Sequence, residues 1–146
     1  MKISIINGPN LNLLGKRETD IYGSTSFDDF FKNIVSNFPD VDFDYYQSNV
    51  EGEIINKLHE ADFLYDAIIL NAGGYTHTSV SILDAILAIK TPVIEIHVSN
   101  IYNREGFRQK SILSKACSGV IVGFVLFMIT IETEMTKLRV EYNLMN

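Results

Sequence analysis

The sequence has little of three features that would define other classes of protein: cysteine, long apolar runs and positive charge. Cys117 is the only cysteine, which excludes an intrachain disulfide and a cysteine-rich metal site. The most apolar run, residues 119–131, is shorter than the ~18 residues that suggest a transmembrane helix. Lys and Arg number 12 against 18 Asp and Glu, and they are scattered, so we expect neither a nucleic-acid nor a membrane partner.

What is present fits one globular domain that spans residues 1–146. Hydrophobic residues make up 47% of the chain and charged residues 21%, which is close to average usage. No repeat or linker divides the sequence. The first residues, MKISIING, turn polar too soon for a signal peptide, so we expect a cytoplasmic protein. We interpret Cys117 as a small buried apolar residue in preference to a catalytic thiol.

Short apolar runs alternate with helical patterns along the chain. Strands are predicted at 2–6, 41–47, 67–71, 92–98 and 119–124, and helices at 26–37, 50–63, 79–89, 104–116 and 126–142. This alternation predicts an α/β protein with a parallel sheet and helices on both faces. Five such strands favour the flavodoxin-like fold, a three-layer arrangement with strand order 2-1-3-4-5.

Local signals refine three of these helices. Thr25 or Ser26 is placed to cap the helix at 26–37. Ser48 and Glu51 form an S-x-x-E pattern, which predicts a capping box for the helix at 50–63. The helix at 79–89 has almost no polar face, so we expect part of it to contact another subunit.

Polar groups follow the predicted strands at the edge where flavodoxin-like folds bind ligands. These segments are 7–10 after the first strand, 71–74 after the third and 95–100 at the end of the fourth. Dinucleotide, P-loop and nucleophile-elbow motifs are absent from the sequence, and its histidines do not cluster as metal ligands do. Proton-transfer chemistry on an oxygen-rich substrate is the interpretation that remains.

Two candidates for that chemistry stand out. His97 is the best acid, and Glu95 lies on the same face of the strand, where it could orient the imidazole or raise its pKa. The alternative is a core histidine with a backbone partner. Tyr22 is a candidate base if nearby Arg17 lowers its pKa from the ordinary ~10, in a segment between Gly15 and Gly23 that would close as a lid. The alternative is a surface loop with an incidental tyrosine.

Taken together, five segments resemble the type II 3-dehydroquinases in order and spacing, over nearly the whole chain. The stretches are INGPNLNLLGKRETDIYG (6–23), LNAGGYTHTS (70–79), PVIEIHVSN (92–100), REGFRQKS (104–111) and GVIVG (119–123). The chain is bulkier than many members of that family at 124–129, which bears on packing and assembly.

The resemblance implies the anti elimination of water from 3-dehydroquinate to give 3-dehydroshikimate through an enolate, in the shikimate pathway. It implies that the Tyr22 phenolate removes the proton next to the ketone and that Arg17 lowers the pKa of this tyrosine. Asn10 would hold a water that stabilises the enolate. His97, held by Glu95, would protonate the departing hydroxyl. No cofactor, metal or Schiff base is implied.

The resemblance also implies a set of substrate-binding groups and an assembly. The enzyme would be a homo-dodecamer, a tetramer of trimers, and one residue would reach the site of a neighbouring subunit. The implied binding groups are the side chains of Asn71, His77 and Arg108, the backbone N–H groups of Val98 and Ser99, and the neighbour's Asp84.

Arg104 lies four residues before Arg108, so a helix at 104–116 would place both on one face. Arg104 would then belong to the lid or be a solvated charge near Glu105.

Other functions remain open at this point. Quinate breakdown uses the same elimination. A receiver-like signalling module on the same fold would need an acidic pair after the first strand and a lysine after the fifth, which this chain lacks. A flavin-binding module would need a phosphate loop after the first strand, where Pro9 removes a backbone donor.

Overall fold

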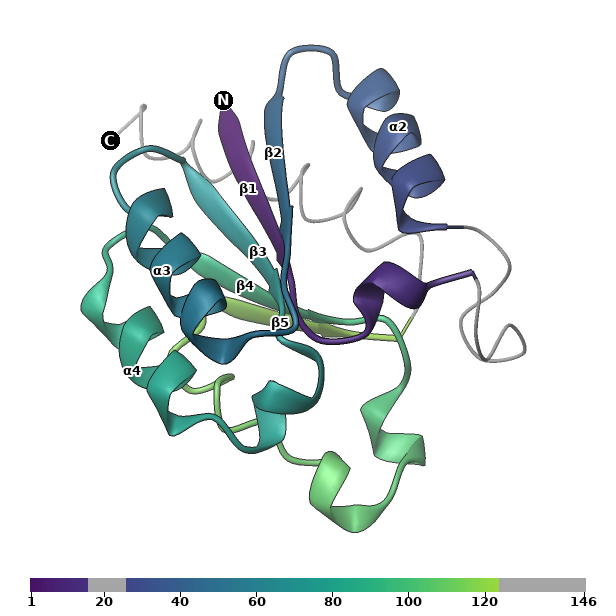
Figure 1. Cartoon of the computed structure of the whole chain (residues 1–146), viewed down its shortest axis with the longest axis vertical. Helices are drawn as coiled ribbons and strands as arrows, with labels where there is room; N and C mark the ends of the chain where they lie inside the picture. The colour runs from purple at the N-terminus through teal and green to yellow at the C-terminus, as the bar shows by residue number, and fades with distance from the viewer. Residues whose placement is uncertain (16–25, 124–146) are drawn as a thin grey trace.

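The computed structural model describes residues 1–15 and 26–123 and confirms the predicted sheet (Figure 1). Five parallel strands pair in the order β2-β1-β3-β4-β5. Their bounds are β1 Lys2–Asn7, β2 Asp42–Gln47, β3 Ala67–Asn71, β4 Val93–His97 and β5 Gly119–Val122. The three α-helices of the described residues are α2 Phe27–Asn37, α3 Glu51–Ala61 and α4 Val80–Ala88. The predicted helix at 126–142 lies outside the described residues.

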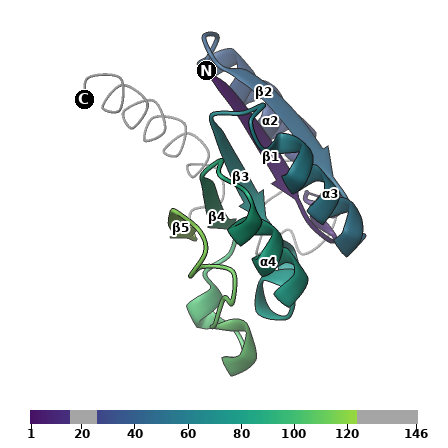
Figure 2. The same ribbon diagram turned by 90° about the vertical axis from the view of Figure 1, so that its left-hand side faces the viewer.

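The helices cover the two faces of the sheet, as the two perpendicular views show (Figure 1, Figure 2). Alternate residues of each buried strand point to opposite faces. In β3, Ile68 and Leu70 pack with α3 and α4, whereas Ala67 and Ile69 pack with α2. Both faces of β3 are therefore fully apolar, which explains its unbroken hydrophobic run.

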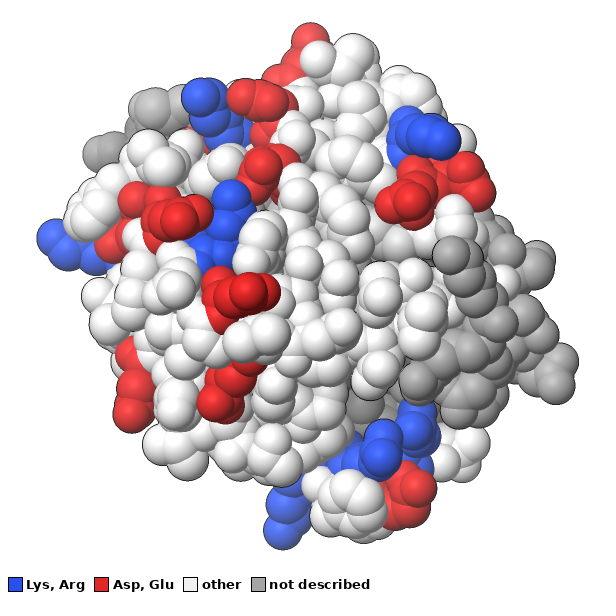
Figure 3. All heavy atoms as spheres, in the orientation of Figure 1, with Lys and Arg blue, Asp and Glu red and all other residues white. Residues whose placement is uncertain are grey.

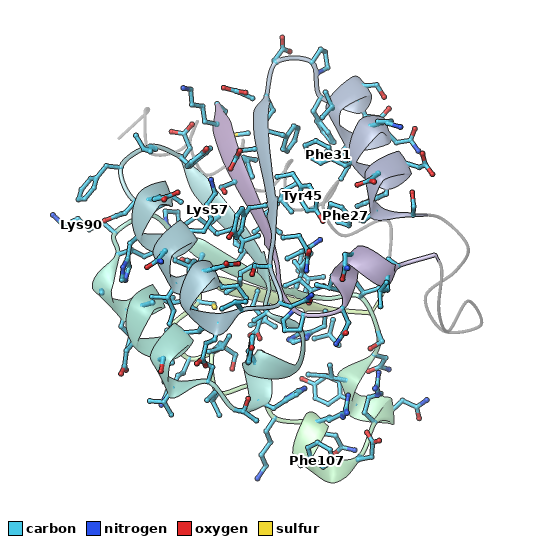
Figure 4. The ribbon with its side chains drawn as sticks, in the orientation of Figure 1. Phe27, Phe31, Tyr45, Lys57, Lys90 and Phe107 are labelled. Atoms are coloured by element: carbon cyan, nitrogen blue, oxygen red, sulfur yellow. The ribbon has the colours of Figure 1, made fainter. Side chains whose placement is uncertain are left out.

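An aromatic cluster joins α2 to the edge strand β2 (Figure 4). The Phe27 ring stacks on the Tyr45 ring with a centroid distance of 4.5 Å, and Phe31 lies 5.4 Å from the same ring. Aromatic pairs of this kind contribute beyond the area that they bury. The cluster holds α2 against β2, which lies at the edge of the sheet.

One predicted helix start is confirmed and one is wrong. The Ser26 hydroxyl accepts the N–H of Asp29 and caps α2. The capping box at Ser48 and Glu51 does not form, because α3 begins at Glu51 with Val50 as its N-cap. The Ser48 hydroxyl instead accepts the Val50 N–H and donates to Glu53. The serine thus orders the turn before the helix.

The predicted helix at 104–116 is also wrong. The segment contains two short 3-10 turns, η3 Ile101–Asn103 and η4 Gly106–Arg108, followed by turns up to β5. The Gln109 side chain donates to the carbonyls of Tyr102 and Arg104, and this supports the loop in place of a helical turn. Arg104 and Arg108 therefore share no helix face.

A serine hydroxyl opposes helix formation in the second half of that segment. Ser111 Oγ accepts the N–H groups of Leu113 and Ser114 at 3.1 and 3.0 Å. Local side-chain bonds of this kind compete with the helical backbone pattern. As a result, the Ser111 hydroxyl points toward Glu95 in strand β4 of the sheet.

The outer surface of α4 carries large exposed apolar side chains beside polar ones. Val80 is 60% exposed and Leu87 is 65% exposed, while Asp84 lies exposed between them. Within the described ranges, no helix is long and apolar enough to cross a membrane.

Candidate active site

A cavity of about 270 Å³ opens at the carboxyl ends of the strands. It collects side chains from the segments that follow β1, β3 and β4, as the predicted fold requires. The lining residues are Pro9, Asn10, Leu11, Leu14, Asn71, Gly73, Gly74, His77, His97, Val98, Ser99, Ile101, Arg104 and Arg108.

Most of the residues predicted for the site therefore meet in one pocket. Glu95 lies behind His97 and does not line the cavity. Asp84 lies exposed on α4, away from the lining residues of its own chain. The predicted base Tyr22 and its partner Arg17 lie outside the described residues.

Glu95 holds the imidazole of His97 at the end of β4. The Nε2 atom of His97 lies 3.0 Å from Glu95 Oε1, and both residues are buried. The predicted pairing of the two side chains is confirmed, and the alternative of a histidine satisfied by a backbone partner is not needed. Because a carboxylate only accepts, Nε2 carries the hydrogen, which leaves Nδ1 as the ring nitrogen that Glu95 does not contact.

Glu95 is fully buried at 0% exposure, so its charge needs compensation. Burial alone would raise its pKa, but hydrogen bonds from His97, Thr76 and Ser111 outweigh burial and hold the pKa below its ordinary value. Glu95 is therefore an anion at neutral pH. Neither hydroxyl residue was singled out from the sequence, although both stand in the stretches THTS and QKS.

The segment after β3 presents an amide and a second imidazole. Asn71 Oδ1 accepts the N–H of Gly73 at 3.3 Å, so its Nδ2 is the group oriented to donate to a ligand. His77 Nδ1 lies 2.7 Å from the backbone carbonyl of Lys110. A carbonyl only accepts, so His77 Nδ1 carries a hydrogen and Nε2 is its other functional atom.

Two arginines and one glutamate form the charged rim of the pocket. Figure 3 shows basic atoms gathered with an acidic side chain over the segment of η3 and η4. Glu105 Oε2 lies 3.8 Å from Arg104 Nε and 3.5 Å from Arg108 Nε. Arg104 also donates to the Ser99 hydroxyl at 3.4 Å. Arg104 lines the pocket and is partly exposed, and it lies beside Glu105 as the sequence indicated.

The Arg108 guanidinium has one buried N–H donor, at Nε, that is available to a ligand. Its Nε is buried and makes no hydrogen bond within the part of the chain that the structure describes, since the Glu105 contact is an ion pair without hydrogen-bond geometry. The guanidinium carbon lies 5.4 Å from the centre of the Phe107 ring. A buried donor in a pocket lining is suited to an anionic or hydroxylated ligand.

Asn10 occupies a strained backbone position that a neighbour supports. Its φ of 67° is left-handed, which asparagine tolerates better than most residues. Its N–H donates to Asn49 Oδ1 at 2.9 Å, and the Gln47 side chain donates to the same oxygen at 3.3 Å. Sequence reasoning missed Asn49 because it follows β2, a strand that does not border the pocket.

The described residues offer little for metal or thiol chemistry. They contain no group of three His, Cys, Asp or Glu side chains that could hold a metal ion. Burial, and secondarily the charge of Glu95, raises the pKa of the Cys117 thiol from 9.0 to about 12. The thiol is therefore protonated at neutral pH and a poor nucleophile.

The fold and pocket together define a flavodoxin-like α/β protein equipped for acid–base chemistry on a small, oxygen-rich anion. The chain belongs to the class II dehydroquinase family, because the family model described as "Dehydroquinase class II" matches residues 1–134.

Individual relatives agree with this assignment. A "3-dehydroquinate dehydratase" of Fusobacterium nucleatum is 55% identical over 129 residues, covering 84% of this chain and 87% of the relative. A protein of the same name from Campylobacter jejuni is 52% identical over 126 residues, covering 85% of this chain and 79% of its own. The crystal structure of type II dehydroquinase from Butyrivibrio crossotus matches with a TM-score of 0.90 and 41% identity, covering 94% of this chain and 97% of that one.

Proposed function

We propose that this class II dehydroquinase is a 3-dehydroquinate dehydratase, a hydro-lyase that converts 3-dehydroquinate to 3-dehydroshikimate. The observation that carries the proposal is the buried pair of His97 and Glu95 at a pocket lined by Asn71, His77 and Arg108. Relatives named for this activity are more than half identical to the chain. We place the reaction in the shikimate pathway, toward chorismate and aromatic amino acids; nothing favours a role in quinate breakdown.

His97 is the general acid of the proposed elimination. Its Nε2–H is committed to Glu95, so Nδ1 delivers the proton to the departing hydroxyl. The Glu95 carboxylate holds the imidazole in the orientation for this transfer. The hydroxyl then leaves as water and the enolate collapses to the conjugated enone.

The remaining step of the reaction is the removal of the proton next to the ketone. The family resemblance assigns the proton abstraction to the Tyr22 phenolate and the lowering of its pKa to Arg17. Asn10 lines the pocket on the side of β1, and the resemblance gives it the water that stabilises the enolate. Anti elimination needs the base and the acid on opposite faces of the substrate ring.

Substrate recognition falls to polar groups around the pocket. The Asn71 amide, the His77 imidazole and the Arg108 guanidinium are suited to the hydroxyls and carboxylate of 3-dehydroquinate. The backbone N–H groups of Val98 and Ser99 follow directly after β4, where parallel strands end and amides are ready donors. No cofactor or metal enters this scheme.

We propose that the chain, as one domain, assembles in the cytoplasm into a homo-dodecamer, a tetramer of trimers. The exposed side chains of Val80 and Leu87 on α4 support a subunit contact there. Asp84 shares this surface, so the same contact would bring it to the site of a neighbouring subunit.

An absorbance assay for the conjugated enone, with purified protein and 3-dehydroquinate, tests the activity. We expect turnover that neither a chelator nor borohydride in the presence of substrate diminishes. Chelator-sensitive turnover, or trapping of a reduced imine, would contradict the mechanism.

Matched tyrosine variants test the base. Tyr22→Phe should reduce kcat by several orders of magnitude with little loss of ligand binding, since general base catalysis alone contributes about 10²–10⁴. Tyr102→Phe, at an exposed tyrosine of η3, should leave kcat unchanged. Near-normal turnover of the Tyr22→Phe enzyme would remove Tyr22 as the base.

A further inference from the structure

We infer that Ser111, together with Thr76, is a positioning residue: the two hydroxyls fix the Glu95 carboxylate in the orientation that holds His97 for proton transfer. The inference rests on the proposed function and adds two residues that lie behind the residues lining the pocket. Neither residue lines the cavity, so neither is expected to touch the substrate.

The Ser111 hydroxyl spans the carboxylate. Its Oγ lies 2.8 Å from both Oε1 and Oε2 of Glu95. It also accepts the N–H groups of Leu113 and Ser114. A serine hydroxyl has two acceptor positions and one hydrogen, and the two amides fill both acceptor positions. The one hydrogen of Ser111 is therefore directed to Glu95.

Thr76 contacts the same carboxylate from a different segment, the one that follows β3. It belongs to the 3-10 helix η2 (Gly73–His77), which follows β3, and it is fully buried. Its hydroxyl hydrogen-bonds to Glu95 Oε1 and lies 3.0 Å from Ser111 Oγ. Because the acceptor positions of Ser111 are filled, the hydrogen of Thr76 also goes to Glu95.

Three donors thus converge on one buried anion. His97 Nε2–H and Thr76 reach Oε1, and Ser111 lies at equal distance from both oxygens. Among the described residues, Ser111 is the one side chain with a hydrogen bond to Oε2. The loss of this hydroxyl would free the carboxylate to rotate. The hydrogen bond that Glu95 accepts from the Nε2–H of His97 would then be weaker.

The catalytic effect has a definite direction. The hydrogen bond from His97 Nε2–H to Glu95 fixes the ring so that Nδ1 is the atom that delivers the proton. A loosened Glu95 holds the ring less firmly in this orientation. kcat should therefore fall, while substrate contacts at Asn71 and Arg108 are unaffected.

A purely structural role for Ser111 is the rival explanation, because its hydroxyl also orders the turn after η4. Ser114 provides the matched control. Its hydroxyl donates to the Ser111 carbonyl at 3.2 Å within the same turn, and no hydrogen bond joins it to Glu95. Thr76→Val offers a second route, since it removes a Glu95 donor without altering that turn.

The test is steady-state kinetics of the full chain with 3-dehydroquinate from pH 5.5 to 9. Misplacement of a catalytic group by about 1 Å can cost about 10²-fold in rate, so we expect kcat to fall by about 10–100-fold in Ser111→Ala and Thr76→Val. KM should stay within about twofold. Ser111→Thr should restore most of the rate, and Ser114→Ala should behave as the wild type.

Three results would overturn the inference: a Ser111→Ala profile equal to the wild type, an equal loss in Ser114→Ala, or a loss in KM alone. If Ser111→Ala does not fold, Thr76→Val and Ser111→Cys decide the question by the same criteria. Nitrogen-15 spectra of labelled histidine give a readout without turnover, with hydrogen on Nε2 of neutral His97 in the wild type and a mixture of tautomers in Ser111→Ala. Wild-type protein inactive on 3-dehydroquinate would contradict the proposed function, and the spectra would still decide the role of Ser111.

Discussion

The carbonyl oxygen of Ala72 lies only 2.6 Å from the position that a Cβ atom on Gly8 would occupy. The two residues follow β1 and β3, whose last residues, Asn7 and Asn71, stand in register. The Gly8 N–H donates to the Asn71 carbonyl at 2.7 Å. This close approach sets the spacing between Asn10, in the segment after β1, and Asn71, at the end of β3.

Gly8→Ala should therefore be destabilising. The methyl group meets backbone atoms that cannot rotate away, and insertions of this kind typically cost about 1–3 kcal/mol. We expect a lower melting temperature by circular dichroism and reduced kcat. Gly52→Ala is the control, since a Cβ at Gly52 in α3 meets nothing within 4 Å and a helical alanine is about 0.5–1 kcal/mol better than glycine. Equal melting temperatures for the two variants would contradict the steric argument.

Glu95 should make stability depend on pH in one direction. Its folded-state pKa is lower than its ordinary value of 4.5, so its contribution is complete above pH 4.5 and is lost as pH falls through the lowered pKa. Urea unfolding of the wild type and Glu95→Gln should differ by about 1–3 kcal/mol at pH 7. The difference should shrink below pH 4.5. Glu60→Gln, at an exposed position of α3, serves as control, and a pH-independent difference for Glu95→Gln would count against its ionisation.

Asn49→Ala should lower activity from outside the pocket. The Asn49 side chain holds the left-handed backbone of Asn10, and small misplacements of a catalytic group cost up to about 10²-fold. We expect kcat/KM to fall by about tenfold with the fold intact. Asn33→Ala, on the exposed side of α2, should have no effect. Wild-type kcat/KM for Asn49→Ala would show that the left-handed turn at Asn10 needs no support.

Leu87→Asp should disrupt assembly. Leu87 is 65% exposed on an α4 surface that also carries Val80 and Asp84, and a buried carboxylate in an apolar contact is costly unless it is paired. Sedimentation velocity should give a dodecamer for the wild type and smaller species for the variant. Val35→Asp, at an exposed apolar position of α2, is the matched control. An unchanged sedimentation coefficient for Leu87→Asp would place the subunit contact elsewhere.

The sheet was predictable because its strands carry strong local signals. The alternation of strands with helical patterns predicts the parallel sheet and its strand order, and the polar residues after the strands predict the edge where the pocket opens. The pairing of Glu95 with His97 follows from the two-residue period of a strand. These inferences need only neighbours in sequence, and the structure confirms them.

The supporting contacts were not predictable for the opposite reason. Thr76 and Ser111 are 35 residues apart, and they meet only after β3 and β4 pair in the sheet. The helix predicted at 104–116 does not form because side chains bond to backbone groups that a helix would use. Gln109 donates to the Arg104 carbonyl, and Ser111 accepts the N–H of Leu113. Hydrophobic periodicity carries no information about such local competition.

The state of Cys117 has a practical use. A rise in thiol pKa from 9.0 to about 12 reduces the thiolate fraction at neutral pH by about a thousandfold. We therefore expect the native chain to react slowly with maleimide reagents at neutral pH. A cysteine introduced at a solvent-facing position could carry a fluorophore or spin label with little competing reaction, without first removing the natural thiol.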